Sequence, residues 1–531
     1  MTRISLKRLQ ASKIRLLEQR APKALSADAP HAVVIGSGFG GLAAAIRLGV
    51  RGYRVTVLER LEQPGGRARV FRDQGFTFDA GPTVVTAPFL FEELWKLCGK
   101  RLEDDVDLRP VTPFYRIRFD DGDVFDYTGS YTQMRDEVSR LSPGDVEGYE
   151  QFVVQSEKIF RVGFEKLAHA PFTHVWDMAR IIPEMMKLES FRTVYGLVSK
   201  YVKSEKLRQI MSFHPLLVGG NPFSTTSIYT LIAFLERKWG VHFPIGGTGV
   251  LVQGMVGLIE GVGGTVRCNA EVAEITVAPH GEENGRVTGV RLASGEHVKA
   301  DLVVSDADAG WTYRHLLAPE HRKRWTDERI ESLRYSMGLF VWYFGTKKKY
   351  EKVAHHTILL GPRYEELLED IFEKKILAED FSLYLHRPTA TDPAMAPEGC
   401  DAFYVLSPVP HLESGTDWAV EGERYRRKIS QYLSDTLLPG VEENLVTSRF
   451  LTPQAFHDDY RSLKGAAFSV EPVLLQSAFF RPHNQSEDVE GLYLVGAGTH
   501  PGAGLPGVLS SARVLDSIVP EPSEVRARAR G

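Results

Sequence analysis

Cysteine is scarce in this sequence, and long apolar runs are missing. Three cysteines, Cys98, Cys268 and Cys400, occur in 531 residues and lie far apart, in no metal-ligand spacing. This pattern excludes a disulfide framework and suits a reducing compartment, by default the cytoplasm. No apolar run reaches the roughly 18 to 20 residues that a membrane-spanning helix needs, so we expect any membrane contact to be peripheral.

A strong excess of charge of one sign is also missing. The formal net charge is −4, which argues against a nucleic-acid partner. Hydrophobic residues make up 43% of the sequence and charged residues 25%, the proportions of a globular protein. Because 531 residues exceed what one hydrophobic core usually serves, we expect two or three structural regions.

The stretch HAVVIGSGFGGLAAAIRLGVRGYRVTVLER, residues 31–60, has the pattern of strand, glycine-rich turn, helix and second strand. Gly36 allows the tight turn, Gly38 lets the backbone approach a pyrophosphate, and Gly41 permits close packing of the helix against the strand. Glu59 ends the second strand, where it can accept hydrogen bonds from ribose hydroxyls. An ordinary glycine-rich turn is the alternative, but the flanking elements and the acidic residue favour a dinucleotide site. These residues alone leave NAD and FAD both open.

Two loops follow this second strand, and another glycine-rich loop lies near the C-terminus. EQPGGRARVF contains Arg67 and FTFDAGPTVV contains Asp79, so these loops can bring backbone N–H groups and a cation to phosphates. GLYLVGAGTHPGAGLPGVLSSARVL again has the pattern of strand, glycine loop and helix. It predicts a second place where the backbone approaches a ligand.

The middle of the sequence predicts two further kinds of structure. YRIRFDDGDVFDY alternates like a β-hairpin with its turn at Asp121 and Gly122, and it indicates an antiparallel sheet separate from the nucleotide domain. SMGLFVWYFG and DAFYVLSPVP are strand-like segments of a later excursion, residues 334–480. Residues 131–239 have helical periodicity with many large apolar side chains. We expect most of these side chains in the core and a minority facing lipid or substrate. The large apolar residues include Phe160, Phe164, Trp176, Met178, Met185, Met186, Phe191 and Tyr195.

The N-terminal residues 1–23 mix basic and apolar side chains, with Glu18 as their one acid. Such a segment can lie on an anionic bilayer as a short amphipathic helix. A solvated tail is an equally supported alternative.

Several motifs together resemble one family. They are VVIGSGFGGLAAAIRL with Glu59, GGRA, FDAGPT, FPIGGTG, SLYLHRPTATDP and the terminal GLYLVGAGTHPGAGLPGV. From about residue 31 to 518 the chain is similar to the bacterial-type phytoene desaturases, FAD-dependent enzymes of carotenoid synthesis within the wider flavin amine-oxidase fold. The resemblance implies FAD as the dinucleotide. Residues 1–30 fall outside it.

Carried over position by position, the resemblance implies a set of FAD-binding residues. The first loop corresponds to the pyrophosphate, Val272 to the adenine, and the C-terminal loop to the ribityl chain and the flavin ring. The full set is Gly36, Ser37, Gly38, Phe39, Gly40, Gly41, Glu59, Arg60, Gly66, Arg67, Gly81, Pro82, Thr83, Val272, Gly496, Ala497, Gly498, Gly504 and Val508.

We therefore predict an α/β fold with a discontinuous Rossmann-type FAD-binding domain, an antiparallel-sheet substrate domain and a helical membrane-facing region. The predicted FAD-binding parts are residues 31–106, 243–310 and 480–519. The predicted substrate domain comprises the hairpin 107–130 and residues 311–479, and residues 131–242 form the helical region. A basic extension, residues 1–30, and a tail, residues 520–531, complete the chain.

Catalytic residues are less clear than cofactor residues. His500 and Arg387 lie inside family-like motifs and are candidates to approach the flavin or the reacting carbons. The structural alternative is favoured, in which His500 orders its loop and Arg387 pairs with a carboxylate. His355 and His356 are adjacent but have no third ligand at metal spacing, so we predict no metal site.

The resemblance implies desaturation of phytoene to a more conjugated carotene, neurosporene or lycopene. The substrate is then a long apolar polyene taken from a membrane surface, and quinone or dioxygen accepts the electrons. We expect a peripheral protein on the cytoplasmic side of the membrane, with no nucleic-acid partner. A desaturase, saturase or isomerase of another carotenoid is one alternative. A non-catalytic isoprenoid-binding protein of the same fold, as in Rab escort and GDP-dissociation-inhibitor proteins, is the alternative of a different class.

Overall fold

The computed structural model describes residues 26–278 and 285–530, and within them five strands form one parallel sheet. Its order is β19 (Leu492–Leu494), β13 (Leu302–Ser305), β1 (His31–Ile35), β2 (Arg54–Leu58) and β9 (Thr265–Arg267). The predicted strand, glycine turn and helix at residues 31–51 are confirmed. The strands come from distant parts of the sequence, so the two glycine-rich loops leave the same edge of one sheet. The basic residues 1–23 lie outside the described residues.

Three helices pack together at this sheet: α2 (Phe39–Arg51), α10 (Thr248–Gly261) and α16 (Leu505–Ile518). Every residue of α2 is buried, and its run of alanines lets α10 and α16 approach it closely. Arg47 of α2 is nevertheless a buried cation. It forms ion pairs of 2.6 Å with Glu93 of α3 (Pro88–Leu97) and with Asp516 of α16. This network ties three helices to one side chain.

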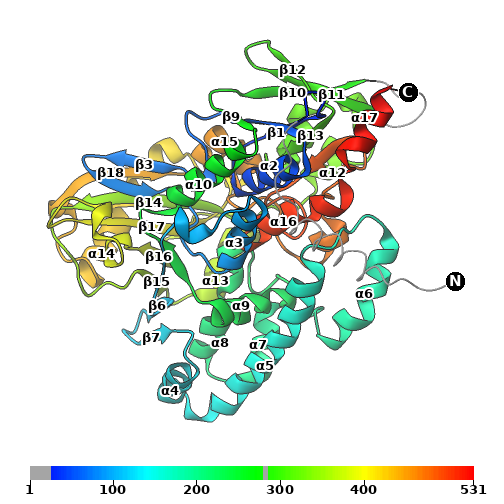
Figure 1. Cartoon of the computed structure of the whole chain (residues 1–531). Helices are drawn as coiled ribbons and strands as arrows, with labels where there is room; N and C mark the ends of the chain where they lie inside the picture. Colours follow the sequence, from blue (N-terminus) through cyan, green and yellow to red (C-terminus); the bar gives the residue numbers. More distant parts are fainter. Residues whose placement is uncertain (1–25, 279–284, 531) are drawn as a thin grey trace.

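A seven-stranded sheet forms the left side of the molecule in Figure 1. Its order is β18 (Leu445–Leu451), β14 (Gly338–Thr346), β17 (Asp401–Val409), β16 (Leu383–His386), β15 (His356–Leu360), β6 (Tyr115–Phe119) and β7 (Val124–Tyr127). The hairpin prediction is confirmed by β6 and β7. The sheet is not wholly antiparallel as expected, because β15 joins β6 in parallel.

Strand β14 shows why this sheet is buried on both faces. Leu339, Val341 and Tyr343 point into the core beside the helical region. Phe340 and Trp342 point the other way, into a second core beneath α14 (Trp418–Thr436). Successive side chains of a strand point to opposite faces. A strand that is covered on both faces therefore needs apolar residues at every position.

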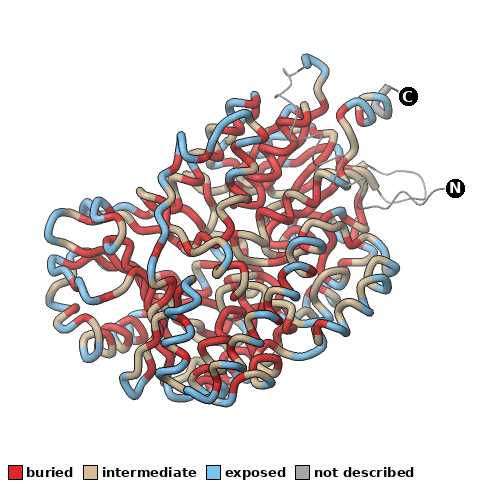
Figure 2. The backbone as a smooth tube through the Cα atoms, turned by 60° about the horizontal axis from the view of Figure 1, so that its bottom comes forward, coloured by how far each residue is buried: buried red, intermediate tan, exposed pale blue. Residues whose placement is uncertain are grey.

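The helical region lies at the bottom of Figure 1. Its helices are α4 (Tyr131–Leu141), α5 (Val146–Val162), α6 (Val175–Lys187), α7 (Val194–Tyr201), α8 (Glu205–Ser212) and α9 (Leu231–Trp239). The expectation that most of its large apolar side chains are core is confirmed, for example at Phe152 and Phe160, and the exposed minority includes Trp176, Met186 and Phe191. Figure 2 shows how much of the outer backbone of the molecule is exposed or only partly buried.

Shorter elements complete the fold. The strands are β3 (Val70–Asp73), β4 (Phe76–Asp79), β5 (Leu108–Pro110), β8 (His242–Pro244), β10 (Val272–Ala278), β11 (Arg286–Leu292) and β12 (His297–Lys299). The helices are α11 (Ala309–Trp311), α12 (Asp327–Glu331), α13 (Tyr364–Glu369), α15 (Pro453–Tyr460) and α17 (Pro522–Arg530).

Candidate functional site

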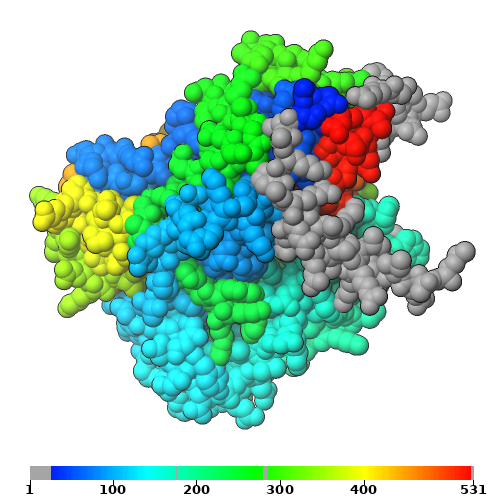
Figure 3. Space-filling view, viewed as in Figure 1, coloured from blue at the N-terminus to red at the C-terminus, as the bar shows by residue number. Residues whose placement is uncertain are grey.

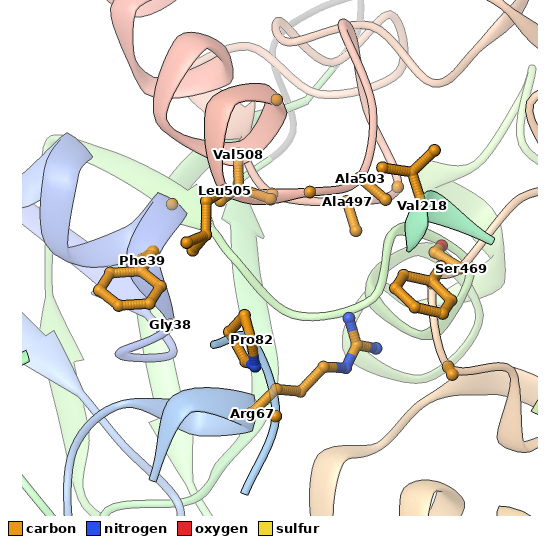
Figure 4. Close-up of a pocket in the computed structure, with 18 of the residues that line it drawn as sticks. Gly38, Phe39, Arg67, Pro82, Val218, Ser469, Ala497, Ala503, Leu505 and Val508 are labelled. Atoms are coloured by element: carbon orange, nitrogen blue, oxygen red, sulfur yellow. The ribbon is translucent and has the colours of Figure 1, made fainter. Parts of the chain in front are cut away.

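Both glycine-rich loops line one cavity of about 570 Å³. The cavity begins at the edge of the parallel sheet and continues between the helical region and the seven-stranded sheet. Figure 4 shows Gly38 and Phe39 on one side of it, Leu505 and Val508 beside them, and Arg67 and Pro82 opposite. All the predicted cofactor residues line this cavity except Gly41.

Gly41 lies behind the lining, where helix α2 meets the first loop. A Cβ atom on Gly41 would lie 2.2 Å from the carbonyl oxygen of Gly36. On Gly40 it would lie 3.0 Å from the backbone nitrogen of Gly496. The two loops are therefore packed more closely than side chains allow, and their backbones border the cavity directly.

Glu59 reaches the cavity from the end of β2. Its buried carboxylate accepts hydrogen bonds from the backbone N–H groups of Ser37 and Leu61, each 2.9 Å long. These bonds fix the carboxylate at the cavity wall beside the first glycine loop. That is the position from which an acidic residue can bind ribose hydroxyls.

Arg67 contributes a partly buried positive charge to the same wall. Its guanidinium donates a 2.9 Å hydrogen bond to Ser462 Oγ, whereas its Nε has no hydrogen-bond partner among the described residues. Burial lowers the pKa of this guanidinium, and the charges of Asp308 and Asp306 oppose the shift without a direct ion pair among residues 26–278 and 285–530. In Figure 4 the side chain extends toward the side of the cavity that holds Ser469 and Ala497. A partly buried cation with an unsatisfied Nε and no direct ion pair fits a ligand that carries phosphate.

Asp306 is a site residue that sequence reasoning missed. It follows β13 in the segment DLVVSDAD and lies against the glycines of both loops, with Oδ1 2.4 Å from where a Cβ on Gly40 would stand. Burial raises the pKa of this carboxyl group to about 7, although hydrogen bonds from the Gly41 and Gly38 backbones oppose the shift. The available signal was its place at the carboxyl end of a buried parallel strand, where ligands bind in open α/β sheets.

The raised pKa of Asp306 predicts a pH dependence. The pKa of Asp306 in the folded state lies above the usual value of 3.8. The contribution of this group to the free energy of unfolding is therefore complete at low pH and is lost as the pH rises through about 7. We expect Asp306→Asn to gain stability relative to the wild type between about pH 5 and about pH 8. Thermal unfolding of both FAD-free proteins across this range measures the difference, and a difference independent of pH would contradict the assignment.

Beyond the loops the cavity wall is apolar. Met178, Ile181 and Met185 of α6 line one side, and Leu339 and Val341 of β14 line the other. Met178 and Met185 therefore belong to the minority of apolar side chains in the helical region that face a ligand cavity. An apolar, enclosed extension of this kind suits a long hydrocarbon substrate.

The two catalytic candidates occupy different places. His500 lines the main cavity; its Nε2 contacts the carbonyl oxygen of Leu167 at 2.9 Å, and its Nδ1 has no partner among the described residues. Burial lowers the pKa of His500 to about 4, so its ring is neutral at neutral pH. Arg387 does not line this cavity. It pairs with Asp401 at 3.1 Å, which is the structural role that the sequence analysis favoured over an approach to the flavin.

The histidine pair also differs from expectation. Strand β16 pairs with β15 so that His386 lies directly across from His356. The statement that His355 and His356 lack a third potential ligand was therefore wrong, because the missing partner comes from another strand.

Comparison with known proteins identifies the family. Residues 39–514, most of the chain, match the family described as "Flavin containing amine oxidoreductase". The chain belongs to this family. Its solved structural neighbours include an oxidoreductase from Methanosarcina mazei, with a TM-score of 0.61 and 19% identity, covering 92% of this chain and 99% of that one. Wild-type putrescine oxidase bound to putrescine has a TM-score of 0.60 at 12% identity, covering 92% and 98%. These two likenesses show the shared fold.

Curated relatives are much more similar in sequence than these solved structures. A neurosporene-forming phytoene desaturase of Cereibacter sphaeroides is 50% identical over 509 residues, covering 95% of this chain and 97% of that protein. A lycopene-forming phytoene desaturase of Pantoea ananas is 50% identical over 490 residues, covering 92% and 98%. The resemblance noted from the motifs is confirmed.

The cofactor of this family member is FAD. The family is one of flavin enzymes, and the glycine cradle, the fixed Glu59 carboxylate and the unpaired Arg67 fit a long dinucleotide with two phosphates. The first motif left NAD and FAD both open, and these findings select FAD. The protein is an FAD-dependent oxidoreductase, which disfavours the non-catalytic isoprenoid-binding alternative.

Proposed function

We propose that this protein desaturates phytoene to a more conjugated carotene, neurosporene or lycopene. The observation that carries the proposal is 50% identity, over nearly the full length of both chains, to phytoene desaturases. The cavity supports it, because an apolar extension follows directly from the cofactor loops. Relatives forming each product are equally identical to this chain, so identity does not select the product.

Each desaturation removes a hydride and a proton from neighbouring carbons. Bound FAD supplies the hydride acceptor. The chain binds and orients the polyene through apolar contacts and keeps water out, since the substrate has no polar anchor. His500 is the group that we propose to accept the proton, because it lines the cavity and its Nδ1 has no hydrogen-bond partner within the described residues.

The test is expression in a colourless host that accumulates phytoene, followed by chromatography and absorption spectra of the extracted pigment. We expect new bands from longer conjugation, whose wavelengths identify neurosporene or lycopene. Unchanged phytoene beside a flavin-loaded protein would indicate a desaturase, saturase or isomerase of another carotenoid. Unchanged phytoene beside a flavin-free protein would revive the isoprenoid-binding alternative. The purified enzyme, assayed without oxygen and then with an added quinone, distinguishes the two proposed electron acceptors.

A patch of exposed apolar side chains supports a peripheral membrane position for this enzyme. In α6, Trp176, Ile182 and Met186 are exposed, while Met178 and Met185 of the same helix line the cavity. The helix packs beside the segment around Phe480, which is also exposed. Helix α6 therefore separates an apolar surface from the apolar cavity, as a docking site for a bilayer-dissolved substrate requires.

We place this surface, with the helical region around it, on the cytoplasmic face of a membrane. Within the described residues no helix combines the length and apolar character needed to cross a bilayer. Figure 3 shows the helical region as the lower, cyan part of the molecular surface. Arg180 and Lys187 of α6 are exposed and complement anionic lipid headgroups.

The double variant Trp176→Ser/Ile182→Ser should bind lipid vesicles at least about tenfold more weakly, because each lost side chain removes apolar burial of about 2 kcal/mol. Its FAD content should be unchanged. Flotation with anionic vesicles measures the effect, and Val420→Ser, which alters an equally exposed apolar residue on α14, is the matched control. Unaltered flotation of the double variant would refute the α6 surface. A variant lacking residues 1–25 tests the N-terminal segment separately.

A further inference from the structure

Three histidines form a buried cluster that the proposed reaction does not use. His386 of β16 pairs across from His356 of β15, and His355 precedes that strand. All three side chains are buried, and a ring nitrogen of each lies within 4.8 Å of one from each of the others. The cluster is assembled from two strands and is fixed by their register.

The hydrogen-bonding capacity of this cluster is largely unused. The Nε2 atoms of all three rings are buried and have no hydrogen-bond partner within the described part of the chain. The Nδ1 of His355 contacts Thr391 Oγ1 at 2.6 Å, and the Nδ1 of His356 contacts the Tyr384 hydroxyl at 2.6 Å. Buried polar atoms are normally satisfied, so several unsatisfied nitrogens in one place indicate a ligand.

The charge state of the rings suits a metal ion. A neutral imidazole keeps one nitrogen lone pair, and none of the three rings forms an ion pair with a carboxylate among the described residues. The nearby carboxylate of Asp401 is already engaged, since it accepts hydrogen bonds from Arg387 Nε at 3.1 Å and Thr389 Oγ1 at 2.7 Å. Neutral imidazoles without a free carboxylate favour a borderline transition metal over calcium or magnesium.

We propose that His355, His356 and His386 bind one divalent transition-metal ion of the zinc class. The two Nδ1 atoms of His356 and His386 are 3.4 Å apart. Two imidazole nitrogens about 2.0 to 2.1 Å from a tetrahedral zinc ion stand about 3.4 Å from each other, so this Nδ1 pair has the required separation. The ion would take the place of the present contact between His356 Nδ1 and the Tyr384 hydroxyl. His355 would supply the third ligand, since ring nitrogens of all three residues lie within 4.8 Å of one another, and water would take the fourth position.

The surroundings give the ion a route and a structural role. His355 lines a second cavity of about 540 Å³, whose walls include Lys349, Glu351 and Arg387, so a hydrated ion can reach the cluster through polar surroundings. On the other side, Tyr384 lies 3.2 Å from Thr83 Oγ1 at the wall of the cofactor cavity. The ion would therefore hold β15 and β16 in register behind that wall without touching the substrate.

The test uses the full-length, FAD-loaded protein after dialysis against a chelator. Titration with zinc should show one ion bound per chain by elemental analysis, with a raised midpoint of thermal unfolding. Titration with cobalt should give the visible absorption of a tetrahedral nitrogen-ligated ion. FAD content is read from the flavin absorbance, so the metal result does not depend on which carotenoid the enzyme uses.

Two variants decide the assignment. His386→Gln should weaken zinc binding at least about tenfold while FAD content stays the same. His411→Gln, at a buried histidine outside the cluster, should bind zinc like the wild type. Should His386→Gln fail to fold, His355→Gln replaces it. The absence of a stoichiometric ion and of the cobalt spectrum, or zinc binding unaffected by the cluster variants, would overturn the proposal and leave the histidines as neutral core residues.

Discussion

Replacement of Gly41 by alanine should abolish FAD binding. The added Cβ atom would stand 2.2 Å from the carbonyl oxygen of Gly36 and 3.0 Å from the Asp306 Cβ. The first contact is with backbone, which cannot rotate away as a flexible side chain can. Relief requires α2 to move away from the first loop, and that loop borders the cofactor cavity. Flavin absorbance per chain after purification measures the loss, and the midpoint of thermal unfolding reports the accompanying destabilisation.

The matched control is Gly257→Ala. Gly257 lies inside α10, and a Cβ atom there would meet nothing within 4 Å. Because alanine favours a helix over glycine by about 1 kcal/mol, this variant should keep its FAD and unfold at the same or a higher temperature. Full flavin content in Gly41→Ala would show that the close contact between α2 and the first loop is not required for binding.

Replacement of Arg47 by leucine should destabilise the protein by about 3–5 kcal/mol, the usual effect of removing one partner from a buried ion pair. Arg47 is almost fully buried and forms ion pairs with Glu93 and Asp516, whose side chains are also largely buried. Burial raises the pKa of Asp516, and Arg47 is the nearest charge that opposes this shift. Without Arg47, Asp516 would lose its 2.6 Å ion pair, and Glu93 would keep only the longer one with Arg513, at 3.5 Å. Chemical denaturation of the FAD-loaded and FAD-free proteins measures the change.

Two controls isolate the effect of burial at Arg47. Arg427→Leu removes an exposed ion pair with Glu423 on α14 and should cost less than about 1 kcal/mol. The triple variant Arg47→Leu/Glu93→Leu/Asp516→Leu removes all three charges and should recover much of the lost stability. Equal destabilisation by Arg47→Leu and Arg427→Leu would contradict a special role for the buried network.

The FAD-binding residues were accessible to sequence reasoning because their requirements are local. A tight turn at Gly36, close packing at Gly41 and an acidic residue at the end of β2 are written into neighbouring positions of one segment. The C-terminal segment likewise combines a strand, a glycine-rich loop and a helix at neighbouring positions, and α16 begins directly after Gly504. Asp306 was missed because a single acidic residue after a strand carries little signal until the sheet places it against two loops.

In the helical region, the sequence pattern could not predict what the apolar side chains face. A periodic apolar pattern looks the same whether it faces a core, a ligand cavity or a bilayer. Only the packing of α6 separates Met178, which lines the cavity, from Trp176, which is exposed. Arg387 shows the same limit, because the strand that carries Asp401 decides what the guanidinium pairs with.

The sequence by itself determined the nucleotide loops, the ribose-binding acid and the family, because each depends on residue types at fixed short spacings. The tertiary structure alone decided that one cavity joins the two glycine loops to an apolar chamber, that α6 has two apolar faces, and that His386 meets His356. These features bring together residues far apart in the chain, and strand register and helix packing, which no local pattern encodes, set which side chains meet.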